Sequence, residues 1–449
     1  MQEKREHWGS KLGFVLAAAG SAIGLGTMWK LPSTMGQNGG GAFILLFLFF
    51  TVIIGLPLFI GELVLGRQAQ RSAVGVFDKF AKGSGYVGIG WLSVATALLM
   101  LGWYCVVAGW GINYALLSLA DSFDSLSIVE VKEKFIIFRN SGELNILWQA
   151  LFILTNVMII MKGVANGIEQ FSKWITSALF ILVITLLCYS ATLPAFGEAF
   201  RYVLYPSFDQ LTADSVLKAL SLALLTLSLG HGVMVTYGGY LNKSDDIPKN
   251  ALIIAATNFF ISIGIALMIF PMVFSLNQEP QAGEGLIFQT LPFVFANLPG
   301  SLLISLLFFA LLIFAALTSS VSMFEASVGT LVDLYSWSRR KATIFSASIA
   351  FVLGIPVALS GSSGVFPTWH TVFGLSFLDT IDVFTGWSLA IVALFTSIFM
   401  GYRLPENIRK QGFTEGSNLG FLYKPWLFSV RVIIPAAIGI ILLHKAHII

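Results

Sequence analysis

Long runs of apolar residues, separated by short polar segments, repeat along the whole chain. A membrane-spanning helix needs about 20 predominantly apolar residues. Eleven stretches meet this requirement to within a few residues: 11–35, 41–66, 88–119, 146–162, 170–192, 214–241, 247–276, 299–335, 342–360, 379–402 and 426–443. The pattern predicts an all-α polytopic membrane protein with eleven transmembrane helices.

Two of these stretches are interrupted by glycine where a spanning helix should be continuous. The first interruption reads Gly-Ser-Ala-Ile-Gly-Leu-Gly over residues 20–26, and the second reads Ser-Leu-Gly-His-Gly over residues 228–232. Glycine favours unwinding, and unwound backbone at membrane depth occurs only where it lines a cavity or is buried in protein. Paired interruptions in two corresponding halves therefore indicate the central binding site of a transporter.

The positions of the interruptions also predict an internal repeat. Each broken helix opens a group of five, and an odd number of spans per group gives the two groups opposite orientations. We therefore expect a 5+5 inverted repeat with helices 1 and 6 broken, formed by residues 11–192 and 214–402, and an additional helix at 426–443. No linker or low-complexity tract divides the chain, which favours a single domain over residues 1–449.

Composition supports a membrane protein and excludes several other classes. The chain is 56% hydrophobic and 11% charged, with a mean hydropathy of +0.84. Most of its 26 lysines and arginines lie on the segments that share a side with the N-terminus. By the positive-inside rule the N-terminus is cytoplasmic and the C-terminus is extracytoplasmic, in the inner (plasma) membrane. The net charge of +3 then reflects topology and gives no reason to expect nucleic acid. Both cysteines, Cys105 and Cys188, fall in apolar spans as packing residues.

Few ionisable residues lie at membrane depth, where a charge is costly. For Glu62 two interpretations stay open: its carboxylate accepts hydrogen bonds from an unwound segment, or it points to water at a helix end. Lys30 and Asp382 lie near the predicted external ends of the first and tenth spans and suggest an ion pair. Arg5 and Asp333 suggest a second pair on the cytoplasmic side.

Hydroxyl and amide oxygens cluster near the predicted breaks. Such groups bind hard cations such as sodium together with backbone carbonyls, although serine and threonine also join membrane helices without any ion. A cluster beside two broken helices favours the ion site. Its members are Thr226, Ser228, Asn258, Thr318, Ser319 and Ser320. The polar stretches 121–145 and 277–298 are expected to be irregular external loops, and the second is a candidate cap over a cavity.

At these residues the chain resembles the neurotransmitter:sodium symporter family, specifically its short bacterial members with the leucine-transporter fold. The resemblance covers nearly the whole chain. Its most specific parts are the first glycine-rich break, an asparagine followed by three glycines at 38–41, Glu62, and Leu-Thr-Ser-Ser at 317–320. It implies a non-enzymatic, sodium-coupled symporter that imports an amino acid or related zwitterion by alternating access. A sodium-responsive sensor or a passive channel with the same fold is the alternative.

The resemblance also implies two sodium sites. Site A would use Gly20, Ile23, Ala315, Thr318 and Ser319. Site B would use Ala22, Thr27, Thr226 and Asn258 together with the substrate carboxylate. Thr27 stands where the family usually has asparagine, so one or two sodium ions are expected.

A substrate site follows from the same resemblance. The substrate carboxylate would meet backbone N–H groups of the first break and the Tyr104 hydroxyl. Leu225 replaces an aromatic residue of the outer lid. His231 replaces an apolar or aromatic residue, and its imidazole either bonds to a freed carbonyl or contacts a polar substrate group. The complete set is Ser21, Ala22, Gly24, Gly26, Met100, Tyr104, Leu225, Thr226, Ser228, His231, Ser319 and Met323.

The resemblance finally implies gates on both sides and bears on chloride. The outer gate would be Lys30 with Asp382, and the inner cluster would be Arg5, Trp8, Tyr240 and Asp333. Ser262 matches a residue of the family's chloride site. Phe47 and Leu222, however, replace the tyrosine and glutamine that complete that site, so no chloride site is predicted.

Overall fold

Every regular element in the described part of the chain is a helix. The computed structural model describes residues 6–280, 283–361, 365–366 and 368–445. The first helices are α1 Lys11–Ala22, α2 Leu31–Gln37, α3 Gly41–Phe50, α4 Leu56–Ala69, α5 Ala73–Ala81, α6 Tyr86–Leu119, α7 Ile128–Asn140, α8 Gly142–Ile160, α9 Gln170–Ala191 and α10 Phe196–Leu204. The others are α11 Ala213–Thr226, α12 Val233–Gly238, α13 Ile247–Ser275, α14 Leu291–Ala296, α15 Ser301–Tyr335, α16 Arg339–Leu359, α17 Trp369–Phe373, α18 Phe377–Ile398, α19 Glu406–Thr414, α20 Tyr423–Phe428 and α21 Ile434–Lys445.

The predicted spans coincide with these helices. Nine helical segments of the described chain are long and apolar enough to cross a membrane, and a tenth forms if Lys11–Ala22 and Gly26–Gln37, bent by 46° to each other, count as one span. The remaining predicted span, 214–241, consists of α11 and α12 with an unwound segment between them. Both predicted breaks are therefore present, one in each broken span.

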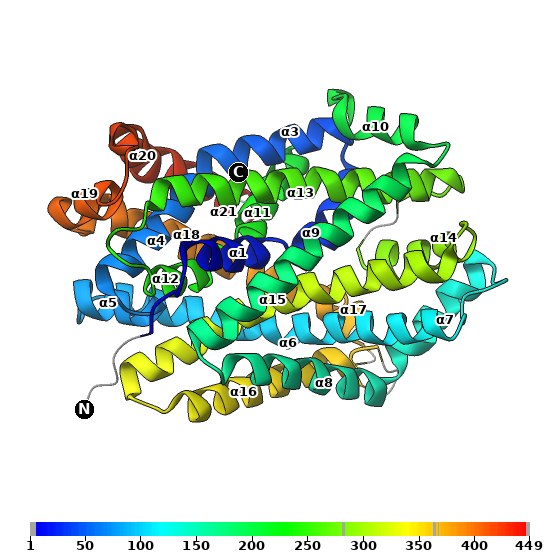
Figure 1. Ribbon diagram of the computed structural model, residues 1–449, viewed down its shortest axis with the longest axis horizontal. Helices are drawn as coiled ribbons and strands as arrows, with labels where there is room; N and C mark the ends of the chain where they lie inside the picture. The colour runs from blue at the N-terminus through cyan, green and yellow to red at the C-terminus, as the bar shows by residue number, and fades with distance from the viewer. Residues whose placement is uncertain (1–5, 281–282, 362–364, 367, 446–449) are drawn as a thin grey trace.

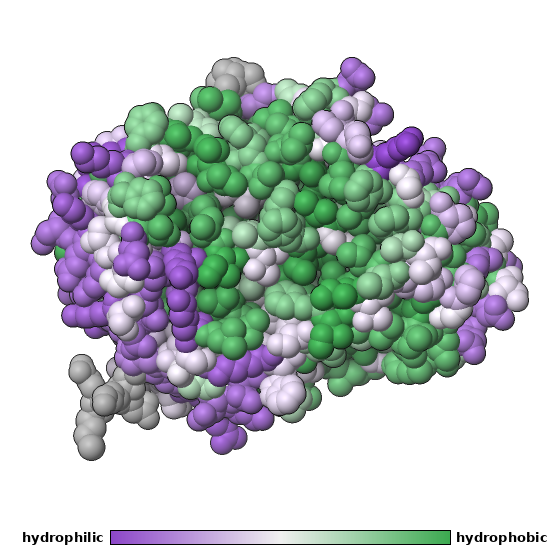
Figure 2. Space-filling view, turned by 45° about the horizontal axis from the view of Figure 1, so that its top comes forward, coloured by the Kyte–Doolittle hydropathy of each residue, from purple (hydrophilic) through white to green (hydrophobic). Residues whose placement is uncertain are grey.

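The two broken spans occupy the centre of the bundle. Helix α1 packs against α9, α13 and α15, and it lies in the middle of the ribbon with these longer helices around it (Figure 1). The long helix α6 packs against α15, α16 and α18. In the space-filling view, apolar side chains cover the middle of the molecule and hydrophilic ones gather toward the two ends (Figure 2). This distribution matches a membrane belt around a buried central site.

Backbone geometry shows why the chain unwinds where it does. Helix α1 begins at Ser10, whose hydroxyl accepts the N–H of Gly13 at 3.0 Å, and it ends before Ile23, whose φ and ψ are −95° and 74°. In the second break Ser228, Gly230 and Gly232 have φ values of +54°, +81° and +75°. Glycine adopts this left-handed region without steric cost, so the two glycines allow the chain to turn from the end of α11 into the start of α12.

The carboxylate of Glu62 stabilises the second break. Its side chain is 1% exposed, and Oε1 accepts the backbone N–H of Gly230 at 2.9 Å. Because the chain is unwound here, this N–H has no helical carbonyl to bond to, and an unpaired N–H in the membrane interior is costly. Of the two interpretations of Glu62, the contact with the unwound segment is confirmed, and the water-facing one is wrong.

The two segments expected to be irregular contain helices instead. Residues 128–140 form α7, which begins with a capping box: Glu130 accepts the N–H of Ser127 at 2.7 Å, and these hydrogen bonds lower the pKa of Glu130. Residues 286–296 form a π-helical turn and α14. Arg139 and Glu284 join the two segments at 3.0 Å. The spacing of this serine and glutamate in the sequence is typical of a capping box and predicts the start of a helix, whereas the polar composition suggested a loop.

The crossing of α4 and α12 allows a direct test of the fold. A Cβ atom added to Gly66 would lie 1.9 Å from the Val235 carbonyl oxygen, so the Gly66→Ala variant forces the two helices apart. We expect it to destabilise the protein by roughly 1–3 kcal/mol, measured as a lower melting temperature in detergent. The matched control is Gly88→Ala, because Gly88 has open space around it. Equal melting temperatures for the two variants would contradict the packing described here.

Candidate functional site

A small cavity of about 30 Å³ lies between the two helix breaks. That volume exceeds the space a single water molecule requires. Apart from Gly26 and Leu225, which are half-buried, its lining residues are buried. All the residues predicted to contact substrate line it, and Leu25 joins them. The lining is Ser21, Ala22, Gly24, Leu25, Gly26, Met100, Tyr104, Leu225, Thr226, Ser228, His231, Ser319 and Met323. We call it the central cavity.

One part of the central cavity is walled by hydroxyl groups that bond to one another. The hydroxyls of Ser21 and Ser228 are 3.0 Å apart, and those of Ser21 and Ser322 are 2.7 Å apart. Ser228 also lies 2.9 Å from the Ser21 carbonyl oxygen and donates to it. This cluster links the first break, the second break and α15. Ser322 was not among the predicted site residues, although its place in the polar run after Thr318 was visible in the sequence.

Another part is formed by Tyr104 and the first break. The Tyr104 hydroxyl oxygen accepts the N–H of Leu25 at 3.1 Å, and the Ser319 hydroxyl donates to the Ser21 carbonyl at 2.8 Å. A Cβ atom on Gly24 would lie 2.3 Å from the Ser319 Oγ, so this position requires glycine. The hydroxyl of Tyr104 is thus held beside freed backbone, where a helix start favours an anion.

The oxygen atoms expected at sodium site A converge at α1 and α15. The Thr318 hydroxyl lies 2.8 Å from the Gly20 carbonyl oxygen and 3.0 Å from that of Ala315. Ile23 follows directly on α1 and is buried. The Ser319 hydroxyl, by contrast, bonds to the Ser21 carbonyl. The oxygen atoms of Gly20, Ala315 and Thr318 therefore lie close together, whereas Ser319 lines the central cavity.

The groups expected at sodium site B form two pairs. The Thr27 hydroxyl donates to the Ala22 carbonyl at 3.2 Å, and the Asn258 amide nitrogen donates to the Thr226 hydroxyl at 3.3 Å. The Oδ1 atom of Asn258 is buried and has no hydrogen-bond partner among the described residues. A buried oxygen that accepts no hydrogen bond is costly unless it binds a cation. The oxygen atoms of these four residues therefore suit a sodium ion.

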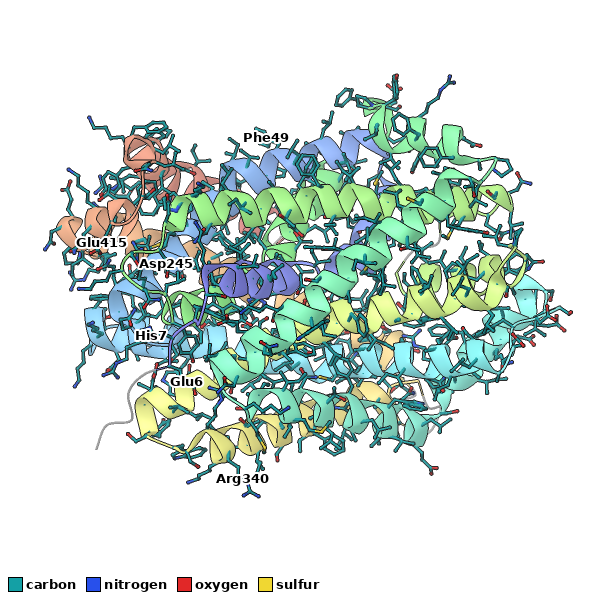
Figure 3. The ribbon with its side chains drawn as sticks, viewed as in Figure 1. Glu6, His7, Phe49, Asp245, Arg340 and Glu415 are labelled. Carbon is teal, nitrogen blue, oxygen red and sulfur yellow. The ribbon has the colours of Figure 1, made fainter. Side chains whose placement is uncertain are left out.

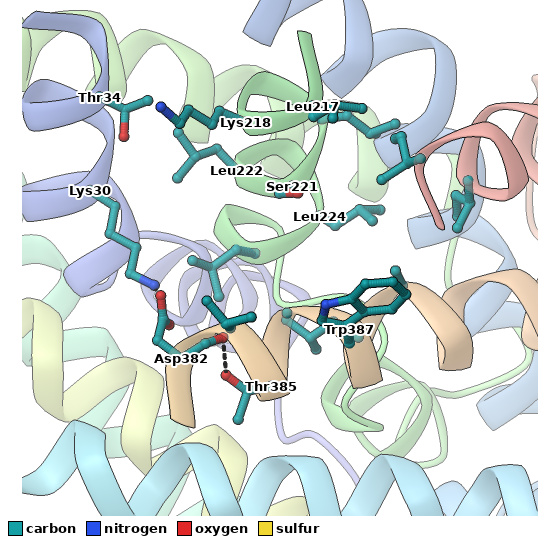
Figure 4. Close-up of a pocket in the computed structure, with 18 of the residues that line it drawn as sticks. Lys30, Thr34, Leu217, Lys218, Ser221, Leu222, Leu224, Asp382, Thr385 and Trp387 are labelled. Atoms are coloured by element: carbon teal, nitrogen blue, oxygen red, sulfur yellow. Dashed lines mark hydrogen bonds and ion pairs between the residues drawn. The ribbon is translucent and has the colours of Figure 1, made fainter. Parts of the chain in front are cut away.

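A larger cavity of about 540 Å³ lies next to the central one (Figure 4). Lys30 and Asp382 form an ion pair at its edge, and their side chains are 20% and 36% exposed. The Lys30 ammonium also lies 5.1 Å from the centre of the Trp103 ring. Met100 and Leu225 line both cavities and so form the partition between them. The predicted pairing of Lys30 with Asp382 is present.

Residues predicted for the inner cluster form hydrogen bonds near the N-terminal end of the molecule. Trp8 donates its indole N–H to the Tyr237 carbonyl at 3.1 Å, and its backbone N–H to the Tyr240 carbonyl at 3.2 Å. The carboxylate of Asp333 accepts the backbone N–H of Ser72 at 2.6 Å. Arg5, the partner expected for Asp333, lies outside the described residues.

A buried ion pair at the same end escaped the sequence analysis. Glu325 is 0% exposed, and it lies 2.6 Å from the Arg339 guanidinium. The Tyr240 hydroxyl donates to the same carboxylate at 2.6 Å. Glu6 lies 3.7 Å from Arg339 and connects the N-terminal segment to the pair, at the end of the molecule where Figure 3 places it beside His7. An acidic residue inside the apolar eighth span was the available signal.

The amino-acid sequence was then compared with known families. Residues 5–125 and 125–444 match the sequence model described as the Sodium:neurotransmitter symporter family. The chain belongs to this family. The protein is therefore a membrane transporter of a sodium-dependent, multi-pass family and not an enzyme. The motifs of the sequence implied the same family.

Individual relatives and a solved structure agree with this assignment. An uncharacterized sodium-dependent transporter of Bacillus subtilis (YhdH) is 38% identical over 99% of this chain and 98% of its own length. A sodium-dependent transporter of Haemophilus influenzae is 32% identical over 99% and 98%. A taurine transporter of Rattus norvegicus, sodium- and chloride-dependent, is 25% identical over 96% and 76%. The crystal structure of MhsT in complex with L-phenylalanine superimposes with a TM-score of 0.88, at 35% identity over 98% of this chain and 99% of MhsT.

The buried ion pair yields a stability prediction. In the Arg339→Gln variant the Glu325 carboxylate keeps its burial but loses its counter-charge, which typically costs about 3–5 kcal/mol. We expect a markedly lower melting temperature in detergent, and partial recovery when Glu325→Gln is added, since no buried charge then remains. Arg340→Gln, at the exposed neighbouring position, is the control. An Arg339→Gln variant as stable as the control would show that the pair contributes nothing.

Proposed function

We propose that this chain is a sodium-coupled symporter that imports an amino acid or a close zwitterionic analogue by alternating access. One observation carries the proposal: residues from two breaks, far apart in the sequence, line a single cavity beside two sets of converging oxygens. In this proposal the chain acts as one domain over residues 1–449, and the repeats at 11–192 and 214–402 supply one break each.

The polarity of the central cavity suits a zwitterion. The Tyr104 hydroxyl and the N–H groups of the first break would hold the carboxylate, since helix starts favour anions. Carbonyls of the unwound segments near Ala22 and Thr226 would accept hydrogen bonds from the amine. Sodium at site B would then lie close to the carboxylate, so ion and substrate would stabilise each other. That mutual stabilisation would couple their transport.

The two ends of the molecule would open in turn. At the end we assign to the outside, the ion pair of Lys30 and Asp382 is partly exposed, and exposed pairs contribute only about 0–1 kcal/mol. Lysine cannot form the bidentate contact of arginine, so this gate should open easily. At the end we assign to the cytoplasm, Trp8, Tyr240, Asp333 and the buried pair would form a stronger closure. Sodium would favour one state only through its differential affinity for the two.

Reconstitution into liposomes tests the proposal directly. Uptake of a mixed amino-acid panel would be read by mass spectrometry with an inward sodium gradient, against a matched potassium gradient. We expect concentrative, saturable uptake of one or a few species with sodium only. Tight binding without uptake would identify a sensor, and unsaturable conductance would identify a channel. Either result would reject symport.

Site A can be tested with one isosteric substitution. Thr318→Val removes the hydroxyl that lies between the Gly20 and Ala315 carbonyls. We expect the sodium concentration for half-maximal uptake to rise at least tenfold, since about 1.4 kcal/mol of lost binding corresponds to that factor. Thr330→Val is the matched control, because Thr330 is also buried in α15 but its hydroxyl donates within its own helix, to the Ala326 carbonyl. A similar effect in both variants would refute a sodium role for Thr318.

Replacement of chloride by gluconate should leave sodium-dependent uptake unchanged. The Ser262 hydroxyl is committed to the Asn258 carbonyl at 2.7 Å. Phe47 is fully buried and stacks on Phe259 with ring centres 6.5 Å apart, and Leu222 is also buried and apolar. An apolar neighbourhood of this kind disfavours an anion. A loss of uptake in gluconate, restored by chloride, would overturn this expectation.

A further inference from the structure

The second break presents an imidazole to the central cavity. His231 lines this cavity and is 2% exposed. It stands between Gly230 and Gly232, whose φ values of +81° and +75° fix the direction of the unwound chain. The contact of Glu62 with the Gly230 N–H anchors this stretch from the other side. The direction of the chain at His231 is therefore set by the unwound backbone around it.

The imidazole has an unused hydrogen-bonding atom. Its Nδ1 is buried and has no hydrogen-bond partner among the described residues. The carbonyl partner expected under one interpretation of His231 is thus missing at this atom. The nearby hydroxyls of Ser21 and Ser228, in contrast, bond to each other and to the Ser21 carbonyl. A buried polar atom without a partner is costly, so a group that enters the cavity and bonds to the imidazole gains more than an apolar group does.

The charge of the cavity limits what that group can be. None of the residues that line it is an aspartate, glutamate, lysine or arginine. A second carboxylate on the substrate would enter a buried site without a fixed counter-charge, which is strongly unfavourable. The remaining walls are apolar and include Met100, Leu225 and Met323. The preferred side chain is consequently uncharged, carries a hydrogen-bonding group and has an apolar stem.

We propose that His231 determines specificity by hydrogen bonding to the side chain of the substrate, and that the substrate is an amino acid with an uncharged polar side chain of the threonine or asparagine kind. The inference rests on the proposed function, because it concerns the substrate of that transporter. A site built around a hydrogen bond discriminates strongly against analogues that lack the bonding group.

Matched substrate pairs test the proposal with the full-length protein in liposomes. The pairs are threonine with valine, asparagine with leucine, and asparagine with aspartate, which differ in hydrogen bonding or charge at similar size. Wild-type protein should favour the first member of each pair by on the order of tenfold or more in apparent affinity. Equal affinity for threonine and valine, or preference for valine or aspartate, would overturn the inference.

Two variants separate the role of the hydrogen bond from that of the shape. His231→Phe keeps a ring but removes both nitrogens, and it should reverse the order of threonine and valine. His231→Gln keeps a donor and an acceptor, and it should retain the order. Sodium-dependent thermal stabilisation of each variant shows whether it is folded. Retention of the threonine preference in folded His231→Phe would remove His231 from the selection. If His231→Phe does not fold, His231→Leu, which also lacks both nitrogens, decides in the same way.

The same assay distinguishes the two proposals. If no amino acid accumulates with sodium, the proposed function fails and the specificity inference fails with it. If accumulation depends on sodium but ignores the polar group, only the inference about His231 fails.

Discussion

The hydrogen bond between the Glu62 carboxylate and the Gly230 N–H is the contact on which the central site depends. A helix that unwinds inside the membrane frees backbone groups that have no water to bond to. Glu62 supplies the missing acceptor from α4 at 2.9 Å, and the glycines make the required backbone angles accessible. Without such an acceptor the unwound segment would be less stable relative to a continuous helix. A continuous helix would remove the space that the central cavity occupies.

At the first break, hydroxyl groups provide hydrogen bonds to backbone carbonyls in the same way. Ser228, Thr318 and Ser319 all donate to carbonyl oxygens of residues 20 and 21, at 2.8–2.9 Å. These carbonyls end α1 and would otherwise face apolar side chains. The groups that stabilise the break are thus among those that we propose bind ions and substrate. Structural and functional demands coincide here, because both require oxygen atoms at the point where the helix opens.

The two ends of the molecule differ in how firmly they are closed. The pair of Lys30 and Asp382 remains partly exposed to solvent, where water screens the charges. In the pair of Glu325 and Arg339 the carboxylate is fully buried, and the Tyr240 hydroxyl also donates to it. Breaking this pair would leave a buried charge unpaired, which is far more costly.

The sequence alone determined the spans and the two breaks, because apolar length and glycine at membrane depth are local signals. The residues around the central cavity were implied by the resemblance to a known family. The sequence left the contact of Glu62 undecided, missed the helix α7, and overlooked Glu325 with Arg339. It did not show that the Ser319 hydroxyl bonds to the Ser21 carbonyl; the role of Ser319 at site A stays a prediction. Only the tertiary structure decided these points, since each depends on which atom lies within hydrogen-bond distance of another from a remote segment. The burial of His231 Nδ1, which has no hydrogen-bond partner within the described part of the chain, is of the same kind, because it arises only once the surrounding helices have excluded water.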